Sequence, residues 1–468
     1  METVSTGIPG LDEILRGGLP SSSMHLVQGP PGSGKTTMAL QFLREGAARG
    51  EKTLYVTLSQ TARDLHRIAD SHGWDIGSVE IVELQAESLG EVSDQSIFQT
   101  VDLRLDRTRQ AVQDAIERVG PDRMVYDSLL EVRLLSPGDD RYQRELMGLR
   151  HFIEARGITV ILIDIEPTDE PTMDTQSRGI VHSVLTFDKV IPSFGRARRR
   201  LQISKVRGID AADGWHDMDI RTGDGVVVFP RLVPAAADRS TKAGDPIRSG
   251  RDRLDDMFGG GMEAGTTTMV VGQAGTGKST IASLYATAAL KRGERVALFL
   301  FEERLETFFR RSAGLGMDLR SYYDSGQLRI YDFNPDAISA GEFGQLVQQE
   351  TSGDDLRVLV IDSFTGYMAS LGHENQALYD IQALLKHTAR RNVLTFLIVA
   401  QTGLLGGGGE TPMDLSFLGD TVLYLRMREV EGHVRRDLVA VKKRHGPHAL
   451  DVRRLIIEPG NVDVGSDE

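Results

Sequence analysis

GPPGSGKT at residues 29–36 and GQAGTGKS at residues 272–279 are two copies of the pattern G-x-x-x-x-G-K-[ST]. Each copy follows a short apolar run, Met24–Val27 or Thr268–Val271, and precedes a stretch with helical periodicity. Glycines in such a loop let consecutive backbone N–H groups turn toward phosphate oxygens, and the following helix adds the positive end of its dipole. A glycine-rich turn with a chance lysine is the alternative, and two copies argue strongly against it. We therefore predict a phosphate-binding loop, or P-loop, in each half of the chain.

The two loops supply the candidate nucleotide contacts. The lysine of each loop is expected to reach the β- and γ-phosphates of ATP, and the hydroxyl of Thr36 or Ser279 is expected to bind Mg²⁺. The predicted ATP-binding residues of the loops are Gly29, Gly32, Ser33, Gly34, Lys35, Thr36 and Thr37 in the first half and Gly272, Gly275, Thr276, Gly277, Lys278, Ser279 and Thr280 in the second.

The loops belong to a longer internal repeat. They lie 243 positions apart, and Leu11-Asp12 and Leu254-Asp255, each just ahead of a glycine cluster, keep the same separation. A nearly constant offset over about half the chain indicates a duplicated domain. Residues 230–249 are rich in Pro, Ala and small polar residues, so the boundary is placed near Ala237. The predicted domains are 1–237 and 238–468.

Strand-like and helix-like segments alternate in each half. This alternation predicts the α/β class, with a mostly parallel sheet wrapped by helices in each domain. Besides the runs ahead of the P-loops, the predicted strands are Thr53–Thr57, Met124–Tyr126, Thr159–Ile163, Val296–Phe301, Val358–Ile361 and Leu394–Ala400, and the predicted helices include Thr36–Ala48 and Arg141–Arg156.

Composition narrows the class of protein. None of the 468 residues is cysteine, which excludes disulfide scaffolds, thiolate catalysis and Cys-ligated zinc. With 40% hydrophobic and 26% charged residues, the chain can bury real cores. The start carries no secretory signal, and no apolar run approaches the roughly 20 residues that span a bilayer, so we expect a cytoplasmic protein without membrane contact.

Nucleic acid is an unlikely partner on charge grounds. The formal net charge of −13 argues against a protein that coats duplex DNA. The basic run at residues 196–200, RARRR, leaves a local nucleic-acid contact as the minor alternative to a solvated strand edge or a subunit contact.

Two aspartates complete the candidate metal sites. Asp127 and Asp362 each end an apolar strand and precede a serine, which suits the carboxylate that holds the Mg²⁺ shell from a neighbouring strand in P-loop NTPases. A strand-terminal aspartate that only caps the chain is the alternative. The predicted metal residues are therefore Thr36, Asp127, Ser279 and Asp362.

The two halves differ at the end of the next strand. The offset of 243 sets Ser59 against Glu302 and Gln60 against Glu303. A carboxylate here can accept a proton from an attacking water or hydroxyl, whereas Ser and Gln have no basic group near neutral pH. We predict that Glu302 and Glu303 are catalytic, and that the first half binds nucleotide but hydrolyses it poorly. A solvated helix start is the alternative for the two glutamates.

The combined pattern resembles the KaiC family of double-domain, RecA-like ATPases. It comprises a GIPGLD-like opening, a P-loop, the Phe301-Glu302-Glu303 strand end, an Asp-Ser pair and a late Lys-x-Arg, and it covers nearly the whole chain. The resemblance implies two RecA-like domains, a hexameric double ring with ATP at subunit interfaces, and a second domain that can phosphorylate itself. It also implies that four further residues bind the ATP of a neighbouring subunit: Lys205, Arg207, Lys442 and Arg444.

The chain also departs from the family's clock members. Alignment on Asp420-Thr421 puts Ser416 on the first of their two phosphoacceptor sites and Phe417 on the second, so a two-site cycle is not expected and Ser416 becomes the candidate phosphorylation site. The sequence ends soon after Arg454–Ile457, which we predict to be the last strand, whereas clock members continue into a partner-binding tail, so regulation by that partner is not expected. Other members act in signalling and stress responses, which implies a signalling partner of unknown identity.

Three functions therefore compete. The favoured one is a magnesium-dependent ATPase with serine/threonine autokinase activity that serves as a signalling or timing switch. A RecA-type DNA-dependent ATPase would normally carry a dedicated DNA-binding or zinc module, and none is evident in the sequence. The third is a nucleotide-gated assembly scaffold, in which partners recognise the shape of the assembly and do not depend on ATP turnover.

Overall fold

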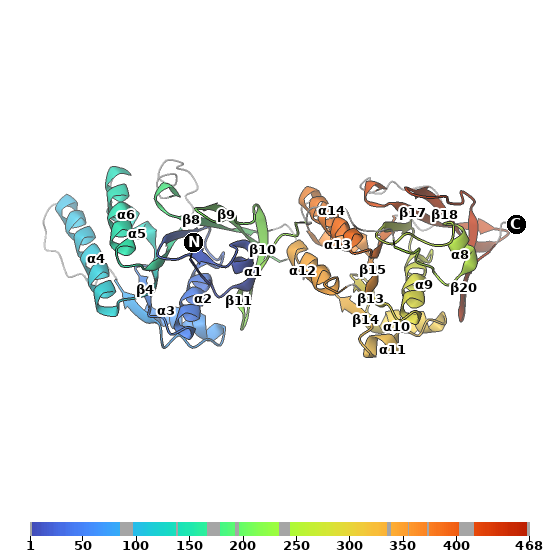
Figure 1. The fold of residues 1–468 in the computed structure, drawn as a ribbon, viewed down its shortest axis with the longest axis horizontal. Helices are drawn as coiled ribbons and strands as arrows, with labels where there is room; N and C mark the ends of the chain where they lie inside the picture. The colour runs from blue at the N-terminus through green and yellow to red at the C-terminus, as the bar shows by residue number, and fades with distance from the viewer. Residues whose placement is uncertain are drawn as a thin grey trace. The chain divides into compact units, whose positions relative to one another are not determined.

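The structure is a computed structural model that describes residues 2–84, 97–136, 139–165, 178–191, 196–233, 244–334, 338–353, 355–371, 374–401 and 416–465. The chain divides into two compact units, Met1–Arg231 and Leu232–Glu468 (Figure 1). The predicted boundary near Ala237 lies outside the described residues and stays a prediction.

The first unit is built on a nine-stranded sheet with the order β11-β10-β9-β8-β3-β7-β6-β4-β5. The strands from β8 to β5 in this order run parallel, and β9, β10 and β11 extend the sheet antiparallel. The strands are β3 (Met24–Gln28), β4 (Thr53–Thr57), β5 (Glu80–Glu83), β6 (Arg123–Asp127), β7 (Thr159–Asp164), β8 (Ser183–Val190), β9 (Arg198–Val206), β10 (Trp215–Arg221) and β11 (Gly225–Phe229).

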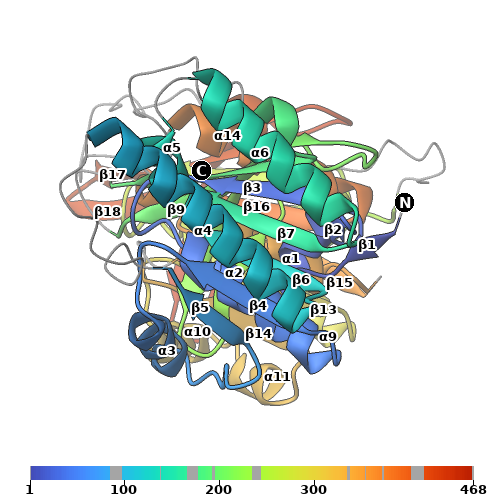
Figure 2. The same cartoon turned by 90° about the vertical axis from the view of Figure 1, so that its left-hand side faces the viewer.

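Helices cover both faces of this sheet because its central strands are apolar on both sides. One core joins α2 to strand residues such as Val27 and Tyr55, and the other joins α4 and α6 to their neighbours Leu26 and Val56. Figure 2 shows α4 and α6 across the second of these faces. The helices are α1 (Pro9–Ile14), α2 (Lys35–Ala48), α3 (Ala62–Ser71), α4 (Ile97–Val119), α5 (Leu129–Leu135) and α6 (Asp139–Glu154), and a short ribbon pairs β1 (Thr3–Val4) with β2 (Leu19–Pro20).

The second unit repeats this topology strand for strand, in the order β14-β13-β15-β16-β12-β17-β18-β19-β20. The three strands from β18 to β20 are antiparallel, as in the first unit. The strands are β12 (Thr267–Gly272), β13 (Arg295–Leu300), β14 (Leu328–Asp332), β15 (Leu356–Asp362), β16 (Leu394–Ala400), β17 (Thr421–Val430), β18 (His433–Lys443), β19 (Arg453–Glu458) and β20 (Asn461–Val464).

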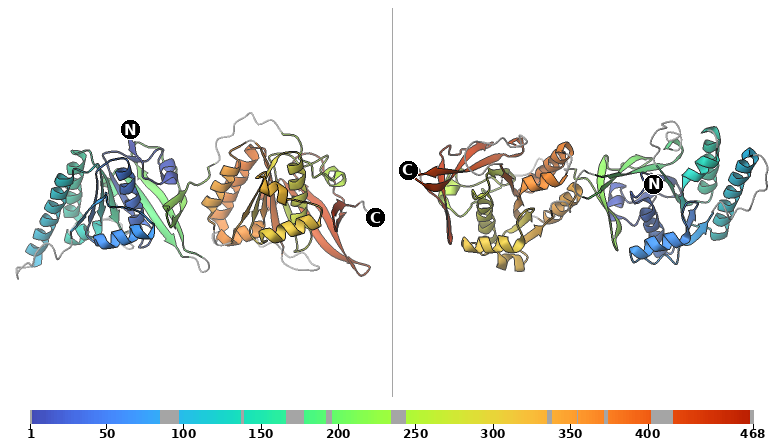
Figure 3. Two further views of the ribbon diagram at one scale, coloured as in Figure 1. Left: turned by 90° about the horizontal axis from the view of Figure 1, so that it is seen from below. Right: turned by 180° about the vertical axis from the view of Figure 1, so that it is seen from behind.

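Helices again lie on both faces of the second sheet (Figure 3). One core contains side chains of α9 and the other contains side chains of α13 and α14. The helices are α8 (Asp252–Asp256), α9 (Lys278–Lys291), α10 (Leu305–Gly314), α11 (Arg320–Asp324), α12 (Ala340–Glu350), α13 (Phe364–Leu371) and α14 (Glu374–Arg390), and η2 (Ser416–Leu418) is a single 3-10 turn. The predicted fold of two tandem RecA-like domains is therefore confirmed.

The predicted elements agree with the structure to within two residues at each end. One prediction needs correction, because Arg454–Ile457 is not the last strand: β20 follows it and pairs with β19. Its four residues alternate polar and apolar, and their inward-facing valines reach the core only once β19 offers an edge. No helix among the described residues is long and apolar enough to cross a membrane.

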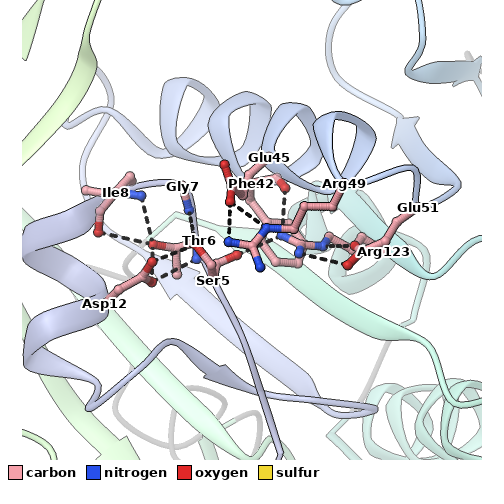
Figure 4. A network of polar contacts seen from close by, with 10 residues as sticks. All are labelled: Ser5, Thr6, Gly7, Ile8, Asp12, Phe42, Glu45, Arg49, Glu51 and Arg123. Carbon is pink, nitrogen blue, oxygen red and sulfur yellow. Dashed lines mark hydrogen bonds and ion pairs between the residues drawn. The ribbon is translucent and has the colours of Figure 1, made fainter.

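The segment before α1 is fixed to the first domain by a polar network (Figure 4). Asp12 accepts hydrogen bonds from the hydroxyl groups of Ser5 and Thr6, at 2.7 Å each. The backbone oxygen of Ser5 in turn accepts a 2.7 Å hydrogen bond from the buried guanidinium of Arg123, which also binds Glu51. In the second domain Asp255 accepts from the backbone of Ser249 at the matching positions. The aspartate of each repeated Leu-Asp motif therefore has a structural role: it fixes the segment that precedes the first helix of its domain.

Candidate nucleotide sites

Each P-loop connects a central strand to a long helix, β3 to α2 and β12 to α9, as the sequence predicts. The residue before each helix, Gly34 or Gly277, has a φ of +110° or +103°. Only glycine adopts this conformation without strain. A side chain there would also meet the neighbouring antiparallel strands, since a Cβ on Gly277 would lie 2.8 Å from the Ile457 side chain.

The P-loop lysines fold back over their own loops. Lys35 Nζ donates to the backbone oxygen of Gly29 at 2.6 Å, and Lys278 Nζ donates to that of Gln273 at 2.8 Å. Burial lowers the pKa of both lysines, and the nearby aspartates Asp127 and Asp362 counteract that shift. Each ammonium group therefore lies beside the carboxylate that the sequence predicts as its metal-site partner.

Most P-loop candidates of the second domain, together with Glu302, Glu303 and Asp362, line one cleft of about 840 Å³, whereas Gly272 and Thr276 are not among its lining residues. Burial raises the pKa of Asp362 above its usual range, while a hydrogen bond with the Ser279 hydroxyl counteracts the rise. A carboxylate and a hydroxyl in contact are the hard oxygen ligands that Mg²⁺ prefers, so this pair fits the ion. The lining residues used in the argument are Lys278, Ser279, Glu302, Glu303, Arg311 and Asp362.

The two glutamates at the end of β13 have different partners. Glu303 is held by Arg311, whose Nε and Nη2 donate to its two carboxylate oxygens at 3.0 and 2.7 Å. Glu302 instead accepts a hydrogen bond from the hydroxyl of Ser363, the residue after Asp362. Glu302 is therefore the carboxylate without an arginine partner among these contacts, and it is the better placed candidate for a general base.

The first-domain site keeps the P-loop but surrounds its metal residues differently. Tyr55, which is fully buried in β4, donates a 2.6 Å hydrogen bond to Asp127. Gln60 Nε2 donates to the Thr36 hydroxyl oxygen at 3.4 Å. Burial raises the pKa of Asp127, and hydrogen bonds from Tyr55 and Ser59 counteract the rise. Oδ2 of Asp127 and the Thr36 hydroxyl oxygen are thus engaged by neutral donors.

Sequence comparison of the two halves missed one carboxylate near the first site. The Ser128 hydroxyl donates to Glu131 on α5 at 2.8 Å, just as the equivalent Ser363 donates to Glu302. The second domain has Gly366 at the position of Glu131, and a Cβ on Gly366 would lie 3.2 Å from Glu302. Glu131 therefore approaches the equivalent serine from the helix rather than from the strand.

An arginine of the antiparallel extension contacts each P-loop. Arg199 Nε donates to the backbone oxygen of Gly32 at 3.2 Å, and Arg436 Nε donates to that of Gly275 at 3.1 Å. The neighbouring Arg200 forms a 2.8 Å ion pair with Asp188. Two arginines of the basic run thus contact their own domain, a role that the constant offset of 237 between Arg199 and Arg436 could have indicated.

The four residues assigned to a neighbouring subunit's ATP lie far from their own P-loop. Lys205 pairs with Val184 and Lys442 with Val422, close to the first residues of β8 and β17. The P-loops follow the last residues of β3 and β12, which run parallel to β8 and β17. Arg207 and Arg444 follow these lysines by two residues and therefore lie still further from the end of the sheet that carries the P-loops. These side chains are therefore at the opposite edge of the sheet and do not reach the nucleotide of their own domain.

Each of the two lysines binds a pair of backbone carbonyls three residues apart. Lys205 Nζ donates to Arg178 and Val181 at 2.5 and 2.8 Å. Lys442 Nζ donates to Ser416 and Gly419 at 2.8 Å each. The candidate phosphoacceptor Ser416 is thus exposed beside Lys442. The first domain has an arginine, Arg178, at the equivalent position.

The remaining two arginines of the Lys-x-Arg motifs are also bound within their own domain. Arg207 Nη2 donates to the Gly179 oxygen at 3.1 Å, and Arg444 forms a 3.0 Å ion pair with Asp420.

Fold and sites together define a tandem P-loop ATPase of the RecA type. A family model described as "ATPase: KaiC" matches residues 4–233 and 247–468. Relatives include the circadian clock protein KaiC3 of Synechocystis sp. (26% identical, 99% of this chain, 92% of that protein), the circadian clock oscillator protein KaiC of Picosynechococcus sp. (27%, 99%, 90%) and the circadian clock protein KaiC2 of Synechocystis sp. (27%, 98%, 80%). The chain belongs to the KaiC family and is a KaiC-like ATPase.

Proposed function

We propose that the second domain hydrolyses ATP with Mg²⁺ and that the first domain mainly binds ATP to support the assembly. The observation that carries this proposal is the single cleft that gathers Lys278, Ser279, Asp362 and Glu302. The first P-loop site has no counterpart of Glu302 at the end of β4, where Ser59 and Gln60 stand.

The side chains of the second site have complementary roles. Lys278 would neutralise the phosphates, and Ser279 and Asp362 would hold Mg²⁺, which offsets the charge of the β- and γ-phosphates when bound. Glu302 would accept a proton as water attacks the γ-phosphorus and the bond to the bridging oxygen of ADP breaks. Arg311 keeps Glu303 in an ion pair, so Glu303 would shape the site rather than take the proton.

The positions of the Lys-x-Arg motifs support an assembly with nucleotide between subunits. Lys205 and Lys442 lie at the edge of the sheet away from their own P-loop, so an ATP that they bind belongs to another copy of the chain. A closed ring is the arrangement that satisfies such head-to-tail contacts in every subunit, and we expect the hexamer of the family.

ATP-dependent assembly is tested by light scattering at micromolar protein with and without saturating Mg-ATP. Because ATP would bind only across the interface, it should raise the assembled mass. Lys442→Ala, on β18, should weaken that response, and Lys386→Ala, which removes a lysine of α14, is the control. A wild-type chain that stays monomeric in Mg-ATP would contradict the interface assignment.

We further propose that Ser416 is an autophosphorylation site. Lys442 contacts the backbone of Ser416, so an ATP bound by Lys442 of this subunit would have its γ-phosphate near that hydroxyl. The serine oxygen would attack the γ-phosphorus, ADP would leave, and Glu302 of the subunit holding the ATP would take the proton.

Phosphosite mapping by mass spectrometry after incubation with labelled ATP tests this assignment. Label is expected on Ser416 and lost in Ser416→Ala, with the buried Thr421 as the control residue. Phosphate found only elsewhere, or none at all, would refute the site. The signalling output and the partner protein remain part of the proposal, supported by the clock proteins among the relatives.

A further inference from the structure

The hydroxyl of Tyr55 contacts the candidate metal aspartate of the first domain. It donates to Asp127 at 2.6 Å, and its side chain is fully buried between β4 and α2. The second domain has Leu298 at the equivalent place in β13: Leu298 pairs with Val360 as Tyr55 pairs with Val125, and each of these valines lies two residues before the candidate metal aspartate. A buried tyrosine hydroxyl needs a hydrogen-bond partner, and here that partner is the aspartate expected to hold the metal shell.

The other metal-directed oxygen of the first site is engaged as well. The amide of Gln60 donates to the Thr36 hydroxyl oxygen. A metal ion would need the lone pairs of both oxygens, directly or through its bound waters. In the second site Ser279 and Asp362 contact each other instead, and carboxylates rather than amides lie beside them. The second site therefore fits Mg²⁺ well, and the first site fits it poorly.

The first P-loop also has a lysine at a position where the second domain has an uncharged residue. The ammonium group of Lys189 on β8 lies 3.2 Å from the place where a Cβ of Gly32 would be. The matching residue of β17 is Met427, because Lys189 pairs with Arg199 and Met427 pairs with Arg436. Among the residues that the structure describes, no atom lies within 4 Å of the equivalent point on Gly275. The extra ammonium group is thus aimed at the loop that would wrap the phosphates.

We propose that the first domain holds its nucleoside triphosphate with little need for a divalent cation. Tyr55 and Gln60 compete with the metal for one oxygen of Asp127 and for the Thr36 hydroxyl, and Lys189 supplies positive charge to the phosphates in its place. The inference deepens the proposed function, since it rests on ATP binding by the first P-loop. The first site would then have a structural role. Its nucleotide would stay bound when Mg²⁺ is removed, and it would lack the ion that phosphoryl transfer requires.

The test measures ATP binding rather than turnover. Full-length Lys278→Ala leaves the first site as the intact P-loop, and Lys35→Ala leaves the second. Equilibrium binding of radiolabelled ATP is measured for each chain in MgCl₂ and in EDTA. Removal of Mg²⁺ should change the Kd of the Lys278→Ala chain by less than about 3-fold and weaken that of the Lys35→Ala chain by about 30-fold or more.

Two substitutions identify the residues responsible. In the Lys278→Ala chain, Tyr55→Phe should make binding in EDTA at least about 10-fold weaker than in MgCl₂, and Lys189→Met should weaken binding in EDTA more than in MgCl₂. Tyr126→Phe is the matched control, because this buried tyrosine lies on the neighbouring strand but belongs to the core under α4 and α6. It should leave the ratio of the two Kd values unchanged.

The outcomes distinguish a failure of the cation-independent site from a failure of ATP binding by the first domain. If the Lys278→Ala chain binds ATP in MgCl₂ and loses it in EDTA as the Lys35→Ala chain does, the cation-independent site is wrong and ATP binding by the first domain stands. If it binds no ATP in either buffer while its tryptophan fluorescence matches wild type, both are wrong. An unchanged ratio in both Tyr55→Phe and Lys189→Met would overturn the roles given to these side chains.

Discussion

Arg311 binds both carboxylate oxygens of Glu303, through Nε at 3.0 Å and Nη2 at 2.7 Å. The pair fixes the end of β13 to α10. Glu302, one residue earlier, is left to contact Ser363, which follows the candidate metal residue Asp362. The two adjacent glutamates cannot be distinguished in the sequence, but they differ in the structure. Glu303 forms a structural ion pair, and Glu302 has a position suited to proton transfer.

The first prediction separates these two glutamates. Glu302→Gln should lower kcat by about 10²–10⁴-fold, which is the usual contribution of a positioned general base. Glu303→Gln removes an ion pair that is partly exposed, with side chains 22% and 28% accessible, so we expect less than about a tenfold loss. Steady-state ATPase assays of both variants check this, with Arg311→Lys as the control for a disturbed pair. Equal losses in the two glutamate variants would show that the division is wrong.

The second prediction concerns the division of labour between the domains. Glu302→Gln combined with Glu303→Gln should nearly abolish turnover while assembly persists, because the P-loop contacts to phosphate remain. Lys35→Ala should weaken assembly and leave appreciable turnover in the assemblies that still form. ATPase rate and light scattering are measured on the same samples.

Glu131 is the residue to examine if turnover survives in the double glutamine variant. Retention of more than about a tenth of the wild-type rate, where loss of a base should cost at least about 10²-fold, would mean that the first domain is catalytic. Adding Glu131→Gln would then remove the remainder if this carboxylate, which contacts Ser128, acts as the base.

Much of the fold follows from the sequence because its signals are local. Apolar runs of strand length and the glycines of the P-loops depend on neighbouring residues, the constant offset needs only a comparison of the sequence with itself, and each predicted element is present. The environment of the first site depends on tertiary contacts instead. Tyr55 looks like any core residue of an apolar strand, and only the placement of β4 beside β6 brings its hydroxyl to Asp127.

The basic side chains near the P-loops escaped prediction for the same reason. Lys189 and Arg199 belong to strands with many charges, where a solvated edge is the ordinary interpretation. Their relation to Gly32 arises because β8 and β9 extend the sheet beside β3. A comparison of the halves at an offset of 237 would have found Arg436 opposite Arg199, but it sets Lys189 against Arg426. Only the strand pairing matches Lys189 to Met427.

The third prediction tests the buried arginine of the first domain. Arg123 is 1% exposed, and its guanidinium binds Glu51 and the backbone oxygens of Ser5 and Phe42. Arg123→Val, which installs the residue that the second domain has at position 358, should destabilise the first domain by about 3–5 kcal/mol because it leaves these groups without their partner. Both tryptophans, Trp74 and Trp215, lie in the first domain, so tryptophan fluorescence during urea unfolding reports on that domain.

Gly46 provides the matched second variant. A Cβ on Gly46 would lie 2.6 Å from the Arg123 side chain, and the second domain has Ala289 at this position. Gly46→Ala alone should therefore destabilise, whereas Gly46→Ala with Arg123→Val should cost less than the two single changes added together. Strict additivity would show that the two positions are not coupled through this contact.

The last prediction is a pH dependence caused by His25. This side chain is fully buried in β3, its Nε2 donates to the Pro20 oxygen at 2.9 Å, and burial lowers its pKa to about 3. A histidine in the unfolded chain has a pKa of about 6.5, so the unfolded state takes up a proton that the folded state refuses. The stabilisation by neutral His25 is therefore fully present above about pH 6.5 and is lost as the pH falls toward 3. Over that window the free energy of unfolding should decrease by about 1.4 kcal/mol per pH unit from this group alone.

His25→Gln keeps an amide donor for the Pro20 oxygen but cannot titrate. The wild-type chain should therefore lose stability relative to this variant below about pH 6, and the difference between the two free energies of unfolding should be constant above pH 7. His182, whose pKa burial also lowers, is present in both chains and cancels in the comparison. Urea unfolding followed by tryptophan fluorescence at several pH values measures this difference, and a difference that does not change with pH would refute the assigned role of His25.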